Sequence, residues 1–141
     1  TARALGLQTA PDWIRERRSE SLPAGKHERY GYENCQAILD SAEQPDGLLV
    51  HTDVVARGVI LALLEQGVRM PERMRLVCSR NAEIDLLCPM PATFLVSSCE
   101  KLAGALLELL VAQHHGQERG PVTLDFEVEV HQPPRRPAQP D

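Results

Sequence analysis

Short apolar runs alternate with segments of helical period through the middle of the chain. Three runs have the length of strands covered on both faces, and each follows a turn-forming or proline-containing stretch. Beside them, apolar residues recur every three or four positions, as on one buried helix face. Strand–helix–strand order predicts right-handed crossovers and a parallel sheet, hence an α/β fold. The expected strands are 48–50, 74–78 and 93–96, and the expected helices are 27–42, 53–66 and 97–116.

The two ends of the chain follow other patterns. Residues 122–130 alternate apolar with mostly acidic positions, which predicts an edge strand or a strand covered on one side. Four prolines and no apolar period predict a disordered or extended tail over 132–141. Near the start we expect the end of a helix over 1–7, an extended piece over 11–14 and a surface loop over 15–26.

Helix ends carry capping signals. Thr52 is the expected N-cap of the second helix, and Gly67 is suited to its C-terminal end. Asp53 is expected to act as a helix-start carboxylate, with direct ligand contact as the alternative. Ser97 and Glu100 have the spacing of a capping box, so Ser97 is expected to begin the last helix.

Composition limits the size and partners of the domain. A chain of 141 residues, 43% hydrophobic and 25% charged, can bury one core but is too short for two ordinary domains. Fifteen basic and 20 acidic residues give a net charge of −5, the wrong sign for binding nucleic acid directly. No apolar run approaches the roughly 18 residues of a membrane span. We expect contact with neither nucleic acid nor membrane by this part.

The chemistry-bearing residues do not indicate catalysis. Cys35, Cys78, Cys88 and Cys99 include no C-x-x-C pair, and Cys35 and Cys99 fall on apolar positions of predicted helices. This favours buried free thiols in a reducing compartment, with disulfides or a zinc site as alternatives. No nucleophile–base pair, G-x-S-x-G, phosphate loop or metal spacing is found. The sequence therefore predicts no enzyme, no cofactor and no metal.

Five segments in order resemble the effector-binding core of LacI/GalR-family transcription regulators. One of them is His51-Thr52-Asp53-Val54-Val55-Ala56-Arg57-Gly58, which is similar to the family's A-N-D-x-x-A-x-G. A turn resembling the family's G-x-x-V-P-x-D-V follows it, and later a segment resembling P-x-L-T-T-V. Each segment alone is weak evidence, whereas five in the right order are much stronger. They are 13–32, 51–58, 65–74, 91–96 and 122–130, within residues 1–131.

The resemblance implies a type I periplasmic-binding-protein-like fold, mainly its C-terminal lobe. It makes 1–131 a partial effector-binding and dimerisation domain, with 1–92 mostly in the C-terminal lobe. The helix 97–116 is then expected in the N-terminal lobe, and 121–131 as a late strand of the C-terminal lobe. A DNA-binding helix-turn-helix and the first subdomain are expected upstream of Thr1, where the chain begins without Met.

Polar residues follow two predicted parallel strands at the point where open sheets bind ligands. Thr52 follows the strand 48–50, and Ser79, Arg80 and Asn81 follow the strand 74–78. By resemblance, Thr52 stands where the family has Asn, Arg80 where it has Asp, and Lys26 where it has a ring-stacking aromatic. We expect Thr52, Arg80, Lys26 and Asn81 to bind a small-molecule effector.

The departures at Arg80 and Lys26 change the charge of the expected cleft. A guanidinium cannot accept hydrogen bonds from sugar hydroxyls, but it binds carboxylate or phosphate bidentately. The hypothesis is therefore an anionic effector, such as a sugar acid or a phosphorylated sugar. In the alternative interpretation, Arg80 is a solvated loop residue or pairs with Glu83 or Asp85.

The expected function is effector sensing and dimerisation in a cytoplasmic LacI-type repressor that reaches DNA only through the upstream helix-turn-helix. By resemblance, 83–88 contacts a second copy, and apolar Ile84, Leu86 and Leu87 suit a two-fold interface. Burial of these residues beneath the sheet is the alternative. A periplasmic solute-binding protein for a sugar-like substrate is the second functional hypothesis, and the upstream sequence would distinguish the two.

Overall fold

The computed structural model describes residues 2–16 and 25–133. The expected tail lies outside the described residues from 134 onward, as does 17–24 of the expected loop. Within the described residues, two 3-10 turns, η1 and η2, precede three α-helices and four strands. The elements are η1 Ala2–Leu5, η2 Pro11–Trp13, α1 His27–Leu39, β1 Gly47–Val50, α2 Asp53–Glu65, β2 Arg75–Asn81, β3 Ala92–Ser97, α3 Cys99–His114 and β4 Glu127–His131.

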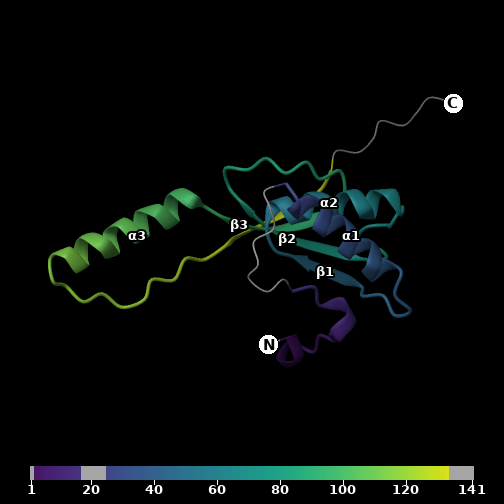
Figure 1. Ribbon diagram of the computed structural model, residues 1–141, viewed down its shortest axis with the longest axis horizontal. Coiled ribbons are helices and arrows are strands. Elements are labelled where there is room, and N and C mark those ends of the chain that lie inside the picture. Colours follow the sequence, from purple (N-terminus) through teal and green to yellow (C-terminus); the bar gives the residue numbers. More distant parts are fainter. Residues whose placement is uncertain (1, 17–24, 134–141) are drawn as a thin grey trace.

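The four strands form one mixed sheet in the order β1-β2-β3-β4. β1, β2 and β3 are parallel, which confirms the α/β crossovers, and β4 pairs antiparallel with β3. β4 therefore makes this a mixed sheet. The reason is visible in Figure 1: α3 extends away from the sheet instead of packing back on it, so the chain returns from the same edge at which β3 ended.

The core lies between the sheet and the helix pair α1 and α2. Leu63, Met74, Cys35 and Cys78 are its largest fully buried side chains. The two helices cross at glycines that let the backbones touch. A Cβ on Gly58 would lie 1.8 Å from the carbonyl oxygen of Glu28, and a Cβ on Gly31 would lie 2.2 Å from that of Val55.

Several local expectations are corrected. η2 is a 3-10 turn where an extended piece was expected, because Pro11 begins a turn and Trp13 donates its indole N–H to the carbonyl of Glu43 at 2.8 Å. The N-cap of α3 is Ser98 instead of Ser97, and its hydroxyl accepts from the amide of Lys101. Cys99 is consequently the first helical residue and is exposed, whereas Cys35, Cys78 and Cys88 are buried; all four are free thiols.

α3 and the chain that returns from it carry eight of the 19 large apolar side chains that are exposed in the described part of the chain. Only Ala112 of α3 is buried. The expected strand 122–130 is formed only from Glu127 onward, because the preceding residues lie alongside no strand. Among the described residues, no helix combines the length and apolar composition needed to cross a bilayer. The exposed members on α3 and the returning chain are Leu102, Leu106, Leu107, Leu110, Val111, Val122, Leu124 and Phe126.

Candidate functional site

Polar side chains gather where the parallel strands β1, β2 and β3 end. α1 precedes β1 and α2 precedes β2, and each helix runs back along the sheet before its strand begins. The N-termini of both helices therefore lie at the same edge as the strand ends. Within such folds, ligands bind beyond the carboxyl ends of the strands. We call this group the polar edge; it consists of His51, Thr52, Asp53, Ser79, Asn81 and Ser97.

Ser79 joins the ends of β1 and β2. Its buried hydroxyl accepts a hydrogen bond from the backbone N–H of Thr52 at 3.1 Å. The Nδ1 atom of His51 lies 2.8 Å from the same oxygen, and the imidazole tautomer decides which group donates. His51 is exposed, and its Nε2 atom has no hydrogen-bond partner within the described part of the chain.

Thr52 holds an unusual backbone conformation at the tip of the first crossover. Its φ is +74° and its ψ is 139°, a region that a β-branched residue rarely adopts. Its hydroxyl accepts from the amide of Val55 at 3.5 Å, which confirms the predicted N-cap. Backbone strain of this kind costs of order 1–3 kcal/mol and concentrates at functional sites.

Asn81 is fixed in orientation by partners on two other elements. Its amide nitrogen donates to Asp53 Oδ2 at 3.4 Å, and its amide oxygen accepts from the Ser97 hydroxyl at 3.2 Å. The Cys99 thiol also lies 3.5 Å from that oxygen. Asp53 is buried at the first position of α2. Its carboxylate therefore serves both the helix start and the orientation of Asn81.

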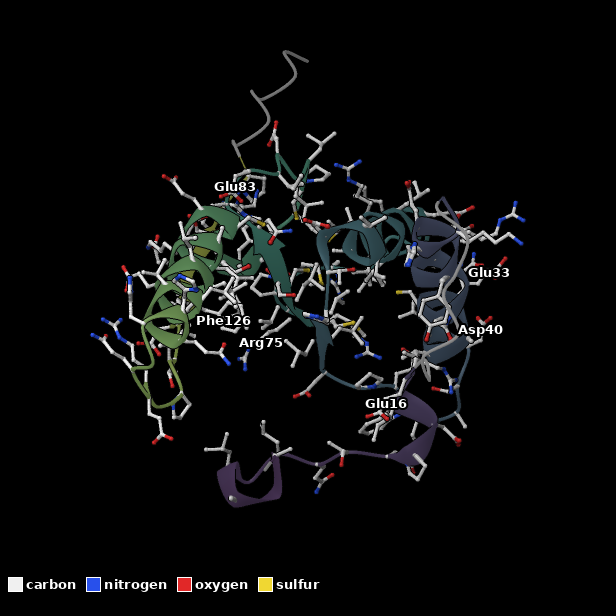
Figure 2. All side chains as sticks on the ribbon, turned by 60° about the vertical axis from the view of Figure 1, so that its left-hand side comes forward. Glu16, Glu33, Asp40, Arg75, Glu83 and Phe126 are labelled. Carbon is white, nitrogen blue, oxygen red and sulfur yellow. The ribbon has the colours of Figure 1, made fainter. Side chains whose placement is uncertain are left out.

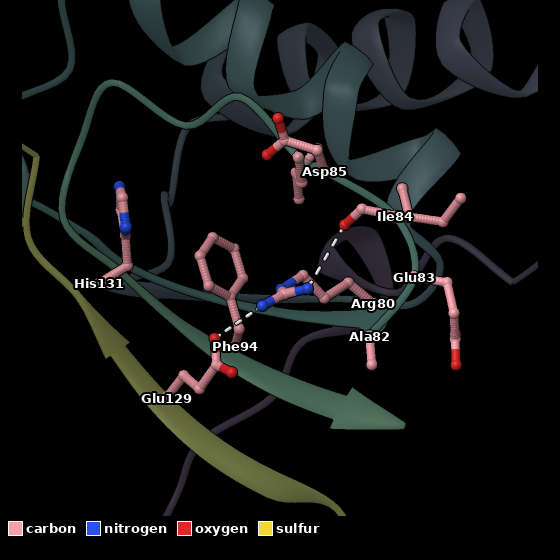
Figure 3. A pocket seen from close by; sticks show the side chains of 9 residues that line it. Arg80, Ala82, Glu83, Ile84, Asp85, Phe94, Glu129 and His131 are labelled. Atoms are coloured by element: carbon pink, nitrogen blue, oxygen red, sulfur yellow. Dashed lines mark hydrogen bonds and ion pairs between the residues drawn. The ribbon is translucent and has the colours of Figure 1, made fainter. Parts of the chain in front are cut away.

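Arg80 lies away from the polar edge. Successive side chains of a strand point to opposite faces, so Arg80 is across the sheet from Ser79 and Asn81. Its guanidinium bonds Glu129 of β4 at 2.7 Å and lies 5.4 Å from the centre of the Phe94 ring (Figure 3). The structure therefore does not bring Arg80 together with Thr52. Neither Glu83 nor Asp85 is its ion-pair partner; an antiparallel β4 supplies Glu129 instead.

A cavity of about 380 Å³ adjoins Arg80 on this second face. It lies between the loop after β2 and the strands β3 and β4, with His131 at one side. The Nε2 atom of His131 is 2.7 Å from the carbonyl oxygen of Cys88, and the ring lies near that of Phe94. The carbonyl oxygens of Asn81 and Ile84 also accept from Arg80, so its charge is well compensated.

The other predicted residues fall at the margins. Lys26 directly precedes α1 and is exposed; no hydrogen bond of its ammonium is found within 2–16 and 25–133. In the expected dimer segment, Leu87 is 85% exposed and Ile84 36% exposed. Leu86 is only 8% exposed and belongs to the core, so burial, the alternative interpretation, applies to this residue.

His51, Ser79, Asp53 and Ser97 complete the polar edge. The sequence analysis noted Ser79 at its strand end and gave Asp53 ligand contact only as the alternative, and it did not consider His51 or Ser97 as ligand residues. His51 and Asp53 flank Thr52, and Ser97 ends the third parallel strand. The rule that ligands bind at strand ends, which selected Thr52 and Asn81, could therefore have selected these residues as well. Among the described residues, no group of three or more His, Cys, Asp or Glu side chains could hold a metal ion.

Three parallel strands that gather polar side chains at their carboxyl ends are typical of open-sheet α/β binding domains. The chain belongs to the family of periplasmic-binding-protein-like domains, whose model matches residues 1–131. The HTH-type transcriptional repressor CytR of Escherichia coli strain K12 is 27% identical over 90 residues, which are 64% of this chain and 26% of CytR. The repressor PurR of Glaesserella parasuis is 28% identical over 131 residues, covering 89% of this chain and 36% of PurR.

Solved structures show the same fold. The regulator CelR in complex with cellobiose superposes with a TM-score of 0.66 at 19% identity, covering 93% of this chain and 38% of that one. The predicted resemblance to LacI-family regulators is confirmed by these relatives and neighbours. The present chain spans about a quarter of the length of CytR and about a third of that of PurR.

Proposed function

We propose that this chain is part of the effector-binding domain of a LacI-type, DNA-binding transcriptional repressor. The polar edge carries this proposal, because it gathers hydrogen-bonding groups at the place where open α/β sheets bind small molecules. The naming of CytR and PurR as HTH-type repressors supports the regulatory role. Contact with DNA would come from a helix-turn-helix outside this chain, and free thiols suit the reducing cytoplasm.

The effector that we propose is a sugar or a sugar acid. The polar edge offers hydroxyl, amide and imidazole groups with one buried carboxylate, a mixture that suits a ligand rich in hydroxyls. The cellobiose complex of CelR is a precedent for a sugar in this fold. An anionic effector would bind Arg80 only by displacing the Glu129 carboxylate from it. Lys26, the exposed residue directly before α1, is the second cation expected to bind such a ligand.

Ligand binding is tested by thermal denaturation of the purified protein with neutral sugars, aldonic and uronic acids, and sugar phosphates. A ligand at one hundred times its Kd raises the free energy of unfolding by about 2.7 kcal/mol, which is readily seen as a higher Tm. For any sugar that stabilises the protein, Asn81→Ala is expected to weaken binding about 5- to 100-fold, the equivalent of one buried hydrogen bond.

Asn34→Ala is the matched control, because the Asn34 amide donates to the Tyr30 carbonyl within α1. It is expected to leave the affinity unchanged. Stabilisation by none of the compounds would contradict the proposed effector class. Equal binding by wild type and Asn81→Ala would remove the polar edge from the site.

The charge of the effector is tested with Glu129→Gln and Arg80→Ala. If the ligand is an acid, Glu129→Gln frees the guanidinium and strengthens binding, whereas Arg80→Ala weakens it. Unchanged affinity in both variants would exclude Arg80 from the ligand site and favour a neutral sugar at the polar edge.

We also propose that the protein forms a homodimer through the exposed surface around Leu87 and Ile84. Leu87→Asp places an unpaired charge in that surface and is expected to shift the protein to monomer. Sedimentation equilibrium measures the change, with Leu61→Asp on the exposed face of α2 as the control. A dimer that survives Leu87→Asp, or a wild-type monomer at all concentrations, would contradict this interface.

A further inference from the structure

His51 meets a buried serine where the first two strands end. The parallel register of β1 and β2, continued by one residue, places His51 beside Ser79. Figure 2 marks the direction of β2: Arg75 begins the strand and Glu83 follows its end, so the polar edge lies at the Glu83 end of the sheet. There the Nδ1 atom of His51 and the amide nitrogen of Thr52 approach a single oxygen, the Ser79 hydroxyl, at 2.8 and 3.1 Å.

The hydrogen bonds of Ser79 decide the tautomer of His51. A hydroxyl has one hydrogen to donate and two lone pairs that accept. The Thr52 amide uses one lone pair, which leaves the hydrogen for the Nδ1 atom of His51. In the opposite arrangement Nδ1–H would use the second lone pair, and the Ser79 hydrogen would need a different acceptor. The described residues supply none, and Ser79 is only 8% exposed, so other groups have little access to it.

The neutral imidazole of His51 therefore carries its hydrogen on Nε2. A buried hydroxyl hydrogen without an acceptor disfavours the other tautomer about 5- to 150-fold. In the imidazolium both ring nitrogens carry hydrogen, so Nε2 is a donor in either charge state. Ser79 thus makes His51 a hydrogen-bond donor, and not an acceptor, toward any group that meets its Nε2 atom.

A donor of fixed direction discriminates between ligands better than a hydroxyl does. His51 and Thr52 are the exposed members of the polar edge, whereas its other members are half-buried or buried. The Thr52 hydroxyl accepts from the Val55 amide, and its own hydrogen can rotate, so it can donate to a ligand or accept from one. The Nε2 atom of His51 requires an acceptor.

We propose that His51 is a specificity-determining residue of the ligand site, held by Ser79 as a donor to a ligand oxygen that bears no hydrogen. On a neutral sugar this is a ring or glycosidic oxygen, and on a sugar acid a carboxylate oxygen serves as well. A ligand that places an ammonium group at His51 is rejected, because two donors would face each other. The tautomer belongs to the protein without a ligand, whereas the role in specificity rests on the proposed function.

Side-chain proton–nitrogen correlation spectra in alkaline buffer distinguish the two neutral tautomers. The signals of His51 are those lost in His51→Gln, and the exposed His114 and His115 serve as references. The ratio of Nε2–H to Nδ1–H in His51 is expected to exceed theirs at least about fivefold, and Ser79→Ala is expected to bring it to their value. Ser97→Ala is the matched control, because this hydroxyl of the same edge bonds other residues, and it should leave the ratio unchanged.

A wild-type His51 ratio equal to that of the references, or a predominance of Nδ1–H, would overturn the assigned tautomer. This holds even if Ser79→Ala does not fold, which circular dichroism would show. An equal ratio in wild type and folded Ser79→Ala would remove Ser79 as its cause.

Specificity is tested with the neutral sugars and sugar acids that raise the Tm in the thermal screen. His51→Gln keeps an N–H donor, whereas His51→Glu has the same length but only acceptors once ionised. For a neutral sugar, His51→Gln is expected to bind within about threefold of the wild type, and His51→Glu about 5- to 100-fold more weakly. For a sugar acid, His51→Ala replaces His51→Glu, because it adds no charge.

Equal affinity of the two variants in either comparison would refute His51 as the donor that selects the ligand. Stabilisation by none of the compounds would contradict the proposed function and the role of His51 in specificity with it. The spectra would still decide the tautomer in that case, so the two failures are distinguishable.

Discussion

Replacing Gly58 by alanine is expected to lower the free energy of unfolding by about 3 kcal/mol or more. The added Cβ would lie 1.8 Å from the Glu28 carbonyl oxygen and 2.7 Å from the Tyr32 nitrogen, and both are backbone atoms that cannot rotate aside. The helices α1 and α2 would have to separate along their whole contact. Urea denaturation followed by circular dichroism measures the loss.

Gly104→Ala is the control for this prediction. Gly104 also lies within a helix, but nothing is within 4 Å of where its Cβ would stand. Alanine there is expected to stabilise the protein by up to about 1 kcal/mol, through helix propensity alone. Similar effects of the two substitutions would contradict the close helix crossing.

Thiol reactivity is expected to separate Cys99 from the other three cysteines by several orders of magnitude in rate. Burial raises the pKa of Cys78 to about 12 and that of Cys35 to about 11, and it also raises the pKa of Cys88. At about pH 8, only around one Cys78 in ten thousand would be a thiolate, the form that attacks disulfide reagents. Cys99 is exposed.

Titration with a chromogenic disulfide reagent is therefore expected to modify one thiol rapidly in the native protein and all four after denaturation. In Cys99→Ser, the rapid phase should vanish. Rapid reaction of two or more thiols in the native state would show that the helix–sheet core opens readily. The absence of a rapid reaction in the wild type would show that Cys99 is shielded from solvent.

The parallel part of the fold was predictable because its signals are local. The run 48–50 forms the predicted strand, and Thr52 and Gly67 delimit the helix that follows. The expectation that both faces of this strand are covered is wrong, because Leu49 is 74% exposed. Gly67 has the positive φ that its position after α2 requires. These residues specify β1–α2–β2 almost without help from the rest of the chain.

The remainder depends on contacts between distant segments. The apolar period over 102–111 predicts a buried helix face, yet the structure exposes that face. Periodicity shows which side of a helix is apolar, but it does not show which element covers that side. Either Ser97 or Ser98 could cap the helix by residue type. The N-cap is Ser98, whose hydroxyl donates to the carboxylate of Glu83, 15 residues away in the sequence.

Only part of the candidate site was predicted, because some of its residues are set by local signals and others by contacts between distant segments. Thr52 and Asn81 were found because strand ends are readable from the sequence, and the structure places both at one edge. The partner of Arg80 was not predictable, since it depends on the register of β4, which begins about 30 residues after β3 ends. Whether these side chains bind an effector stays a prediction for the titrations above.

The backbone at Thr52 has a practical consequence for engineering. A search for thermostable variants would favour glycine there, because glycine adopts the observed φ and ψ without penalty and loses only a few tenths of a kcal/mol as an N-cap. Such a variant would gain heat resistance while discarding the hydroxyl at the crossover tip. On the proposed function, selection for robustness and selection for effector binding therefore pull this one position in opposite directions.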